Sequence, residues 1–218
     1  MYFILQPHQQ TDHPDLIAQM FRLRKKVFGD ELRWVETFGP EERDAYDDMN
    51  PVYLMHTDPA GAYLYSVVRM MPMSGPTLLS DVFSETIPDA AGFIDPSIWE
   101  FTRFCMDDDL LRRHGRGSEC MQILKMMNTG SLEFGVDAGI EAYVANFDRL
   151  RWRMWRRIGK PFDIVGKSDD FGVEVLLGIS ECSGAVRDRM YAHLGIQGPV
   201  LSEPPRAAMV EEMHRDAA

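Results

Sequence analysis

A glutamate and an arginine stand inside an otherwise apolar and aromatic stretch, Ile98-Trp99-Glu100-Phe101-Thr102-Arg103-Phe104. The stretch is typical of a buried strand, and a buried charge is costly unless it is paired or used. We therefore expect Glu100 and Arg103 to belong to a functional site. Because a regular strand sends residues of odd separation to opposite faces, we also expect a bulge that re-aims one of them.

The first third of the chain carries a second set of charged and aromatic side chains: Arg24, Phe28, Trp34, Asp44, Asp47 and Arg69. Aromatic residues alone more often fill a core, and loop aspartates alone more often face solvent. Together, however, these charges exceed what a structural core tolerates, because buried charges need partners. The pattern indicates a cluster of ion pairs at a functional site.

A basic segment with two glycines, Arg112-Arg113-His114-Gly115-Arg116-Gly117-Ser118, lies between a predicted strand and a predicted helix. Glycines let backbone N–H groups approach a phosphate, and the dipole of the following helix attracts the same group. The form Arg-x-x-Gly-x-Gly resembles the pyrophosphate loop of GNAT-type acyltransferases, which hold coenzyme A or a pantetheine arm. We expect Arg112, Gly115 and Gly117 to bind phosphopantetheine.

The hydrophobic pattern that must position these residues predicts an α/β fold with a central mixed sheet and helices on both faces. Strands are expected over 2–5, 52–56, 62–71, 97–106, 141–147, 162–165 and 173–179. Helices are expected over 15–28, 77–83, 118–138 and 149–158, the third with Ser118 as its N-cap. Residues 29–50 form a long polar loop, of a length that is usually functional or disordered. We expect one domain over 1–198 and a weakly packed tail over 199–218.

Composition excludes several classes of protein. The net charge of −11 argues against a nucleic-acid partner. No stretch reaches the roughly 20 apolar residues of a membrane span, and the N-terminus lacks the basic region of a signal peptide, so we expect a cytoplasmic protein. The three cysteines and six histidines show no metal-ligand spacing, so no metal is expected. Cys105 is expected to be inert core.

One segment departs from the acidic average, with six cations in twelve residues and no acid among them: Arg149, Arg151, Arg153, Arg156, Arg157 and Lys160. This local basic surface could receive an acidic or phosphorylated partner. A solvated helix face is the equal alternative.

The segment Phe21–Phe28, Trp34 and the run Asp44-Ala45-Tyr46-Asp47-Asp48 resemble the acyl-homoserine lactone synthases of the LuxI type. Eight positions agree with the motif of that family in identity and order: Arg24, Phe28, Trp34, Asp44, Asp47, Arg69, Glu100 and Arg103. The segments 68–72 and 76–83 fit as well. The match runs over roughly 18–106 and is looser beyond it. The fold of the family is GNAT-like, in agreement with the glycine-containing segment.

The resemblance implies a reaction between an acyl thioester and S-adenosylmethionine, whose amine attacks the acyl carbonyl and whose carboxylate then displaces methylthioadenosine to close a lactone. The sulfonium is already a good leaving group, so no cofactor is expected. Glu100 is the candidate base for the amine. Asp44 and Asp47 are expected to bind the cationic substrate, and Arg24, Arg69 and Arg103 to pair these carboxylates and orient the substrate carboxylate. Packing on S-adenosylmethionine is expected from Phe28, Trp34, Phe83 and Phe101.

The acyl chain is expected beside the segments 143–147 and 149–158, against Val144, Ala145, Trp152 and Trp155. Family members that favour 3-oxo chains commonly carry a threonine in this strand. Ala145 offers no hydroxyl, so unsubstituted acyl groups are expected. The tryptophans either shorten the pocket to suit a branched or aryl group or simply pack. The donor is either acyl carrier protein, for which the basic run is suited, or acyl-CoA.

Two rival functions remain at this stage. A GNAT-type N-acyltransferase with an ordinary amine acceptor would need the phosphate loop but not Arg24, Trp34 and the aspartate pair. A degenerate family member could act only as a binding module, although buried charges without a use would cost stability. Binding of S-adenosylmethionine separates the first rival from a lactone synthase, and the turnover of a Glu100→Gln variant separates the second.

Overall fold

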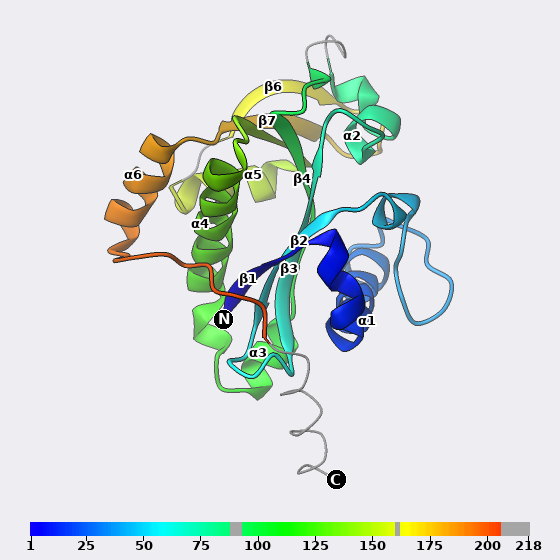
Figure 1. Ribbon diagram of the computed structural model, residues 1–218. Coiled ribbons are helices and arrows are strands. Elements are labelled where there is room, and N and C mark those ends of the chain that lie inside the picture. The colour runs from blue at the N-terminus through cyan, green and yellow to red at the C-terminus, as the bar shows by residue number, and fades with distance from the viewer. Residues whose placement is uncertain (88–92, 160–161, 206–218) are drawn as a thin grey trace. The chain divides into compact units, whose positions relative to one another are not determined.

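The computed structural model describes residues 1–87, 93–159 and 162–205. Its seven strands form one sheet in the order β1-β2-β3-β4-β5-β7-β6 (Figure 1). β4 pairs with β5 in parallel, whereas β1 with β2, β5 with β7 and β6 with β7 pair antiparallel. The predicted mixed α/β fold is therefore confirmed. The strands are β1 (Tyr2–Leu5), β2 (Val52–Thr57), β3 (Leu64–Pro72), β4 (Ile98–Met106), β5 (Ala142–Phe147), β6 (Asp163–Ser168) and β7 (Val175–Glu181).

The helices are α1 (Pro14–Arg24), α2 (Leu78–Asp81), α3 (Asp108–Arg113), α4 (Cys120–Ala138), α5 (Arg149–Arg157) and α6 (Gly184–Leu194). Short 3-10 turns occupy Pro7–Asp12, Ala45–Asp48, Ser84–Thr86 and Gly117–Glu119. The sequence pattern did not predict α3 or α6. It also placed the start of α4 at Ser118, but this residue lies inside a 3-10 turn and the α-helix begins at Cys120.

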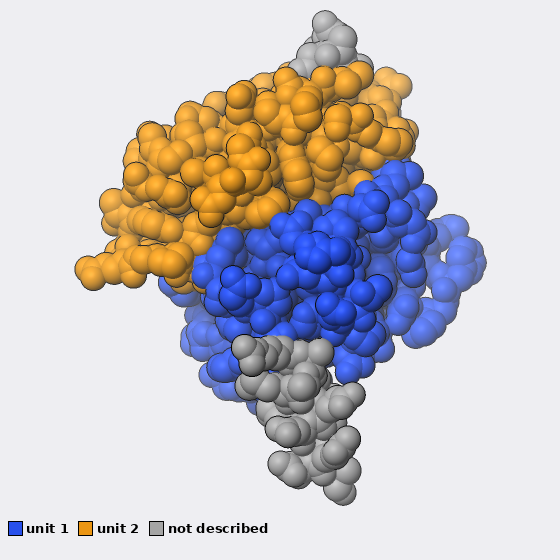
Figure 2. All heavy atoms as spheres, viewed as in Figure 1, with its two compact units in different colours: residues 1–69, 103–123, 201–218 blue, residues 70–102, 124–200 orange. Residues whose placement is uncertain are grey.

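The chain divides into two compact units, coloured separately in Figure 2. Unit 1 comprises Met1–Arg69, Arg103–Ile123 and Leu201–Ala218, and unit 2 comprises Met70–Thr102 and Leu124–Val200. The chain passes from one unit to the other within β3, β4 and α4.

The core of unit 1 is formed by α1 and the strands β1 to β3. Leu16, Met20 and Leu23 recur at helical spacing along α1 and are buried together with Phe3 and Leu5 of β1. Burial of each such side chain contributes about 1.5–3 kcal/mol. Buried and partly buried residues alternate along β1, as expected for a strand with one face toward the core.

The end of α1 continues as a π-helical turn over Lys25–Glu31, where the N–H of Leu32 donates to the carbonyl of Val27 at 2.9 Å. The helix predicted to end at residue 28 is therefore longer than expected, but its last turns are wider. Phe28 is buried within this turn, and π-helical turns occur frequently at functional sites.

Unit 2 packs side chains on both faces of its part of the sheet. Val144 and Leu177 lie with Met73 and Leu79 on one face. The side chains that alternate with them point the other way. There the hydroxyl of Tyr143 donates to the carbonyl of Ser131 in α4 at 2.8 Å. The aromatic rings on this second face lie 5.3–6.0 Å apart, centroid to centroid, and belong to Phe101, Tyr143, Phe147, Trp155 and Phe162.

The first residues of the predicted tail make backbone hydrogen bonds. The N–H of Val200 donates to Glu133 Oε1 at 2.7 Å within unit 2. In unit 1, Leu201 pairs with Tyr2, and the N–H of Ser202 donates to the Tyr2 carbonyl at 2.8 Å. Residues 206–218 lie outside the described part, and the boundary at 198 stays a prediction. None of the helices in the described ranges is long and apolar enough to cross a membrane.

Gly178 of β7 gives the first testable prediction, because a Cβ there would lie 2.6 Å from Phe147 Cζ and 2.7 Å from Phe162 Cβ. We expect Gly178→Ala to destabilise the protein by about 1–3 kcal/mol, since an overpacked core must shift its rings. Gly75→Ala is the control, because a Cβ at this glycine meets nothing within 4 Å. Thermal unfolding measures both. A Gly178→Ala protein as stable as the control would contradict the packing described here.

Candidate active site

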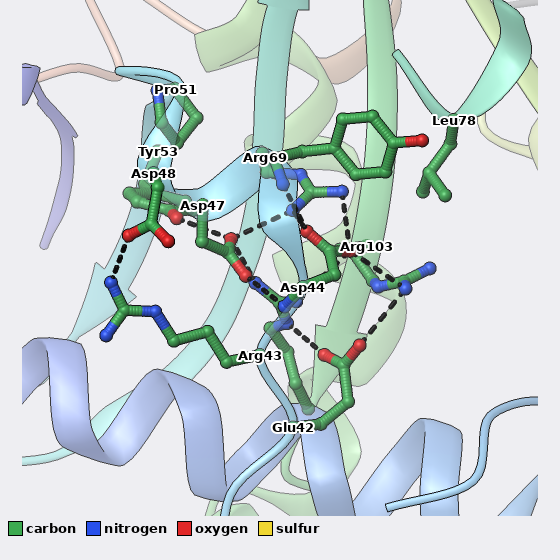
Figure 3. Close-up of polar contacts among 12 residues, drawn as sticks. Glu42, Arg43, Asp44, Asp47, Asp48, Pro51, Tyr53, Arg69, Leu78 and Arg103 are labelled. Atoms are coloured by element: carbon green, nitrogen blue, oxygen red, sulfur yellow. Dashed lines mark hydrogen bonds and ion pairs between the residues drawn. The ribbon is translucent and has the colours of Figure 1, made fainter. Parts of the chain in front are cut away.

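Three arginines and three carboxylates form a cluster of ion pairs in unit 1 (Figure 3). Arg24 and Arg69 are 0% and 1% exposed, so neither charge can rely on water. The formal charges of the six groups cancel, and their ion pairs and hydrogen bonds offset part of the cost of burying them. The members are Arg24, Glu42, Asp44, Asp47, Arg69 and Arg103.

Asp47 accepts hydrogen bonds at both carboxylate oxygens. Its Oδ1 accepts from Arg24 Nη1 at 2.6 Å, from Arg69 Nη1 at 2.9 Å and from the Tyr53 hydroxyl at 2.8 Å. Its Oδ2 accepts from the backbone N–H of Asp44 at 2.9 Å. Burial alone would raise the pKa of this carboxyl, but the hydrogen bond and charge of Arg24, with the charge of Arg69, hold it well below its ordinary value. Asp47 is therefore ionised.

Asp44 holds the short 3-10 turn Ala45–Asp48 by its own side chain, which accepts from the N–H of Tyr46. Asp47 closes the turn from the other end, so the pair forms a capping box. The spacing of three residues thus has a local structural reason. Arg69 donates two hydrogen bonds to Asp44, from Nη1 to Oδ1 at 2.5 Å and from Nη2 to Oδ2 at 3.0 Å. This bidentate geometry fixes the orientation of the carboxylate and also compensates its charge.

Arg103 reaches the cluster because the backbone of β4 is irregular at this residue. Its φ is +54°, a left-handed conformation that costs a non-glycine residue about 1–2 kcal/mol. The left-handed backbone at Arg103 is an irregularity of β4 close to the place where the odd spacing of Glu100 and Arg103 led us to expect a bulge. Arg103 Nη2 lies 3.0 Å from both Glu42 Oε1 and Asp44 Oδ2, and its guanidinium lies 5.3 Å from the ring centre of Phe28. These contacts offset the strain.

Sequence reasoning missed one member of the cluster, Glu42, and the neighbouring Tyr53, which donates to Asp47. Glu42 pairs with Arg24 Nε at 2.5 Å and is 5% exposed, but in the sequence it cannot be told from its neighbour Glu41 in the same polar loop. Tyr53 is 1% exposed, and in the sequence it looks like any aromatic residue of a buried strand. Burial and the neighbouring Asp47 raise the pKa of its hydroxyl. Only the fold separates these two residues from structural ones.

The aromatic residues predicted beside the cluster lie together. The rings of Phe28 and Trp34 are 6.3 Å apart, and the backbone N–H of Trp34 donates to the Phe28 carbonyl at 2.9 Å. Phe28 is buried, whereas Trp34 is 49% exposed. A half-exposed tryptophan next to a buried charge cluster offers a surface on which a planar or cationic ligand can pack.

Glu100 belongs to unit 2. Its side chain, 2% exposed, accepts from the N–H of Leu79 at 2.6 Å and from the N–H of Leu78 at 3.3 Å. The carboxylate thus sits on the first backbone donors of α2, which explains how it can be buried. Phe83, also predicted for the site, follows α2 and contacts the ring of Phe171 at 5.1 Å.

The predicted acyl-chain residues are divided between two faces of the sheet. Ala145 and Trp155 lie on the face of the aromatic group, where Trp155 contacts Phe101 at 5.7 Å. Val144 is on the opposite face, because neighbouring strand residues alternate. Phe101, predicted to pack on S-adenosylmethionine, is placed with Trp155 and not with Phe83. The indole N–H of Trp152 donates to the Phe162 carbonyl at 3.4 Å.

Part of the predicted phosphate loop is helical, and the binding of phosphopantetheine by Arg112, Gly115 and Gly117 stays a prediction. Arg112 lies in the last turn of α3, where it is 66% exposed and pairs with Asp109. It is therefore helical, because Asp107 caps a helix that the glycines alone did not reveal. Gly115 has φ +72° with open space at its Cβ position, and a Cβ on Gly117 would meet the Arg112 side chain at 2.7 Å. These two glycines do form the turn before α4.

Two remaining expectations concern the Cys105 thiol and metal binding. Burial raises the pKa of the Cys105 thiol to about 12, which fits the prediction of a core cysteine. Within the ranges that the structure describes, no group of three or more His, Cys, Asp or Glu side chains is arranged to hold a metal ion.

Comparison with known proteins supports the resemblance seen in the sequence. The family described as autoinducer synthase matches residues 8–190. An acyl-homoserine-lactone synthase of Agrobacterium fabrum is 30% identical over 167 residues, which cover 76% of this chain and 78% of that protein. The isovaleryl-homoserine lactone synthase of Bradyrhizobium diazoefficiens is 32% identical over 130 residues, which cover 59% and 55% of the two chains.

Solved structures share the fold. The structure of a CoA-dependent acyl-homoserine lactone synthase, BjaI, with SAM and isopentyl-CoA has a TM-score of 0.76 at 21% identity and covers 99% of both chains. The acyl-homoserine lactone synthase LasI has a TM-score of 0.67 at 20% identity, covering 88% of this chain and 94% of that one. The GNAT-like α/β fold predicted from the sequence agrees with these structures.

The ion-pair cluster predicts a graded loss of stability. Asp47→Asn removes the charge that two buried guanidiniums share, so we expect a loss of about 3–5 kcal/mol. Tyr53→Phe removes one neutral donor from a carboxylate with three others, so we expect about 1 kcal/mol. Asp48→Asn, whose carboxylate is 69% exposed, should change stability by less than about 0.5 kcal/mol. Denaturant unfolding measures all three, and equal losses at positions 47 and 48 would contradict the cluster.

Proposed function

This chain belongs to the autoinducer synthase family, and we propose that it makes an N-acyl-homoserine lactone from S-adenosylmethionine and an acyl thioester, releasing methylthioadenosine. The observation that carries the proposal is the buried cluster around Asp47, which assembles five of the eight residues that the family resemblance singles out. An ordinary N-acyltransferase has no evident use for this cluster.

The reaction needs two bond exchanges. The amine nitrogen of S-adenosylmethionine bonds to the acyl carbon, and the thioester C–S bond breaks to release the thiol. The carboxylate oxygen then bonds to the carbon next to the sulfonium, whose C–S bond breaks to release methylthioadenosine. The sulfonium departs as a neutral thioether, so we propose that no cofactor is used. Glu100, directly or through a water, takes the proton from the amine.

We assign roles to the members of the cluster according to the solvent exposure of their side chains. The side chains of Arg24, Arg69 and Asp47 are at most 1% exposed, so they act as positioning residues. Arg103 and Asp44 are 12% and 19% exposed. These two form the accessible part of the cluster, where Asp44 can attract the cationic substrate and Arg103 can orient its carboxylate. Trp34 offers packing surface to the adenosyl group.

The acyl donor has two candidates. The names of similar proteins support acyl-CoA, because BjaI is CoA-dependent and its structure holds isopentyl-CoA. The surface of α5 supports acyl carrier protein. Within the described part of the chain, the exposed Arg153, Arg156 and Arg157 have no acidic partner, whereas Arg149 pairs with Glu174 and Arg151 with Asp148. Lys160 of the basic run lies outside the described residues. Either donor would bring the phosphopantetheine arm for which Gly115 and Gly117 are proposed.

The acyl group is proposed to be short or branched and unsubstituted. Trp155 and Phe101 bring large rings to the face that Ala145 shares, which leaves less room than aliphatic side chains would. Ala145 has no hydroxyl to bond a 3-oxo group. Mass spectrometry of the medium of expressing cells reads the acyl mass, and a dominant long-chain or 3-oxo lactone would count against this assignment.

Glu100→Gln tests the mechanism. We expect kcat for lactone formation to fall about 10²- to 10⁴-fold, because the amide cannot take the proton, while the protein stays folded. Glu85→Gln, on an exposed residue of the turn after α2, is the matched control and should keep full activity. Activity is followed as methylthioadenosine released, with circular dichroism to check the fold. Unchanged turnover in Glu100→Gln would remove this residue from the chemistry.

The α5 surface gives a separate prediction about the donor. If acyl carrier protein docks there, the double variant Arg153→Glu and Arg157→Glu should raise KM for acyl carrier protein about tenfold or more and leave KM for acyl-CoA unchanged, because only the carrier protein needs the surface. Arg189→Glu, an exposed arginine of α6, is the control. Equal KM values for the carrier protein in the variant and the control would leave acyl-CoA as the donor.

A further inference from the structure

Asn128 of α4 carries an amide nitrogen, Nδ2, that is buried without a hydrogen-bond partner among the described residues. The residue is 1% exposed. An unpaired buried donor costs about 1–3 kcal/mol, and asparagine is also a poor residue for a helix interior. A leucine at this place would avoid both costs. The position therefore points to a partner that binds from outside the chain.

The side chain of Asn128 faces the sheet. Gly135 stands seven residues later, about two turns on the same side of α4. A Cβ on Gly135 would lie 2.8 Å from Tyr143 Oη and 2.4 Å from Cys182 Sγ. This side of the helix therefore faces β5 and the end of β7.

The level of Asn128 along the sheet follows from the chain connection. Only residues 139–141 join α4 to β5, so the helix runs antiparallel to the strand. Two helical turns correspond to about 10 Å, or about three strand residues. Asn128 is thus placed beyond Tyr143, near Ala145, which points to the same face as Tyr143. Ala145 is the smallest side chain on this face of β5.

The pairing between β4 and β5 also ends close to Ala145. β4 and β5 pair through Ile98↔Ala142, Trp99↔Tyr143 and Glu100↔Val144. In the described ranges, this pairing ends at Val144, whereas β5 continues to pair with β7 through Phe147. From Ala145 onward, the described β5 residues have no pairing partner in the part of β4 that belongs to unit 2. A ligand that carries amide or thioester carbonyls suits this place, but a saturated acyl chain offers Asn128 no acceptor.

We propose that Asn128 Nδ2 donates a hydrogen bond to a carbonyl oxygen of the thioester arm of the acyl donor. The inference rests on the proposed function for the identity of the donor. Because coenzyme A and acyl carrier protein carry the same arm, the contact serves either source. Asn128 is then a substrate-binding residue on α4 that the motif of charged and aromatic residues does not include.

The experiment compares Asn128→Leu, which removes the polar group at similar size, and Asn128→Asp, which keeps the shape without the donor. Isovaleryl-CoA is the probe, titrated by calorimetry into the full chain, and S-adenosylmethionine is titrated separately. Thr129→Val is the matched control, because this neighbouring hydroxyl is buried and already donates to the Lys125 carbonyl of the same helix.

Asn128→Leu should weaken isovaleryl-CoA binding about tenfold, leave binding of S-adenosylmethionine unchanged and keep or raise the Tm. KM for acyl carrier protein should rise by the same factor if that is the donor. Unchanged isovaleryl-CoA affinity would overturn the inference. A lowered Tm with weaker binding of both substrates would also overturn it, because this indicates a structural role. A wild-type protein that binds isovaleryl-CoA but releases no methylthioadenosine would refute the proposed function instead.

Discussion

The ion pairs around Asp47 are the interaction on which the candidate site depends. One oxygen of the Asp47 carboxylate accepts hydrogen bonds from two buried arginines and a tyrosine. These donors belong to α1, β2 and β3, so the carboxylate links three elements. Removing that charge would leave two guanidiniums with too little compensation in a place that water does not reach. The cluster is neutral as a whole and costly to disturb at its fully buried members Arg24, Asp47 and Arg69.

This constraint explains two features that would otherwise be unfavourable. The polar segment 29–50 has little apolar surface to bury, yet its second half is fixed because Glu42, Asp44 and Asp47 are ion-paired. Strand β4 accepts a left-handed residue at Arg103 because its guanidinium finds two carboxylates and an aromatic face there. In both places, strain or chain ordering is offset by charge pairing.

Sequence reasoning predicted the elements that follow from periodicity and the residues that stand out by type. Charges inside an aromatic strand are visible without a structure, and the odd spacing of Glu100 and Arg103 led us to expect an irregularity such as the left-handed residue found at Arg103. Glu42 and Tyr53 could not be predicted, since a loop glutamate and a strand tyrosine look alike whether or not they meet a buried arginine. Arg112 was misplaced because the cap that starts α3, Asp107, resembles any acidic residue after a strand. Asn128 escaped notice because burial without a partner is a property of the fold.

The central claim is that the buried cluster builds a binding site for S-adenosylmethionine, and the most direct test is the affinity of an Arg103→Asn variant for that substrate. Asparagine tolerates the left-handed backbone, so the variant removes the guanidinium with little effect on β4. We predict folded protein whose Kd for S-adenosylmethionine rises at least about tenfold, since a charge-assisted hydrogen bond is lost. A folded variant with the wild-type Kd would contradict the account.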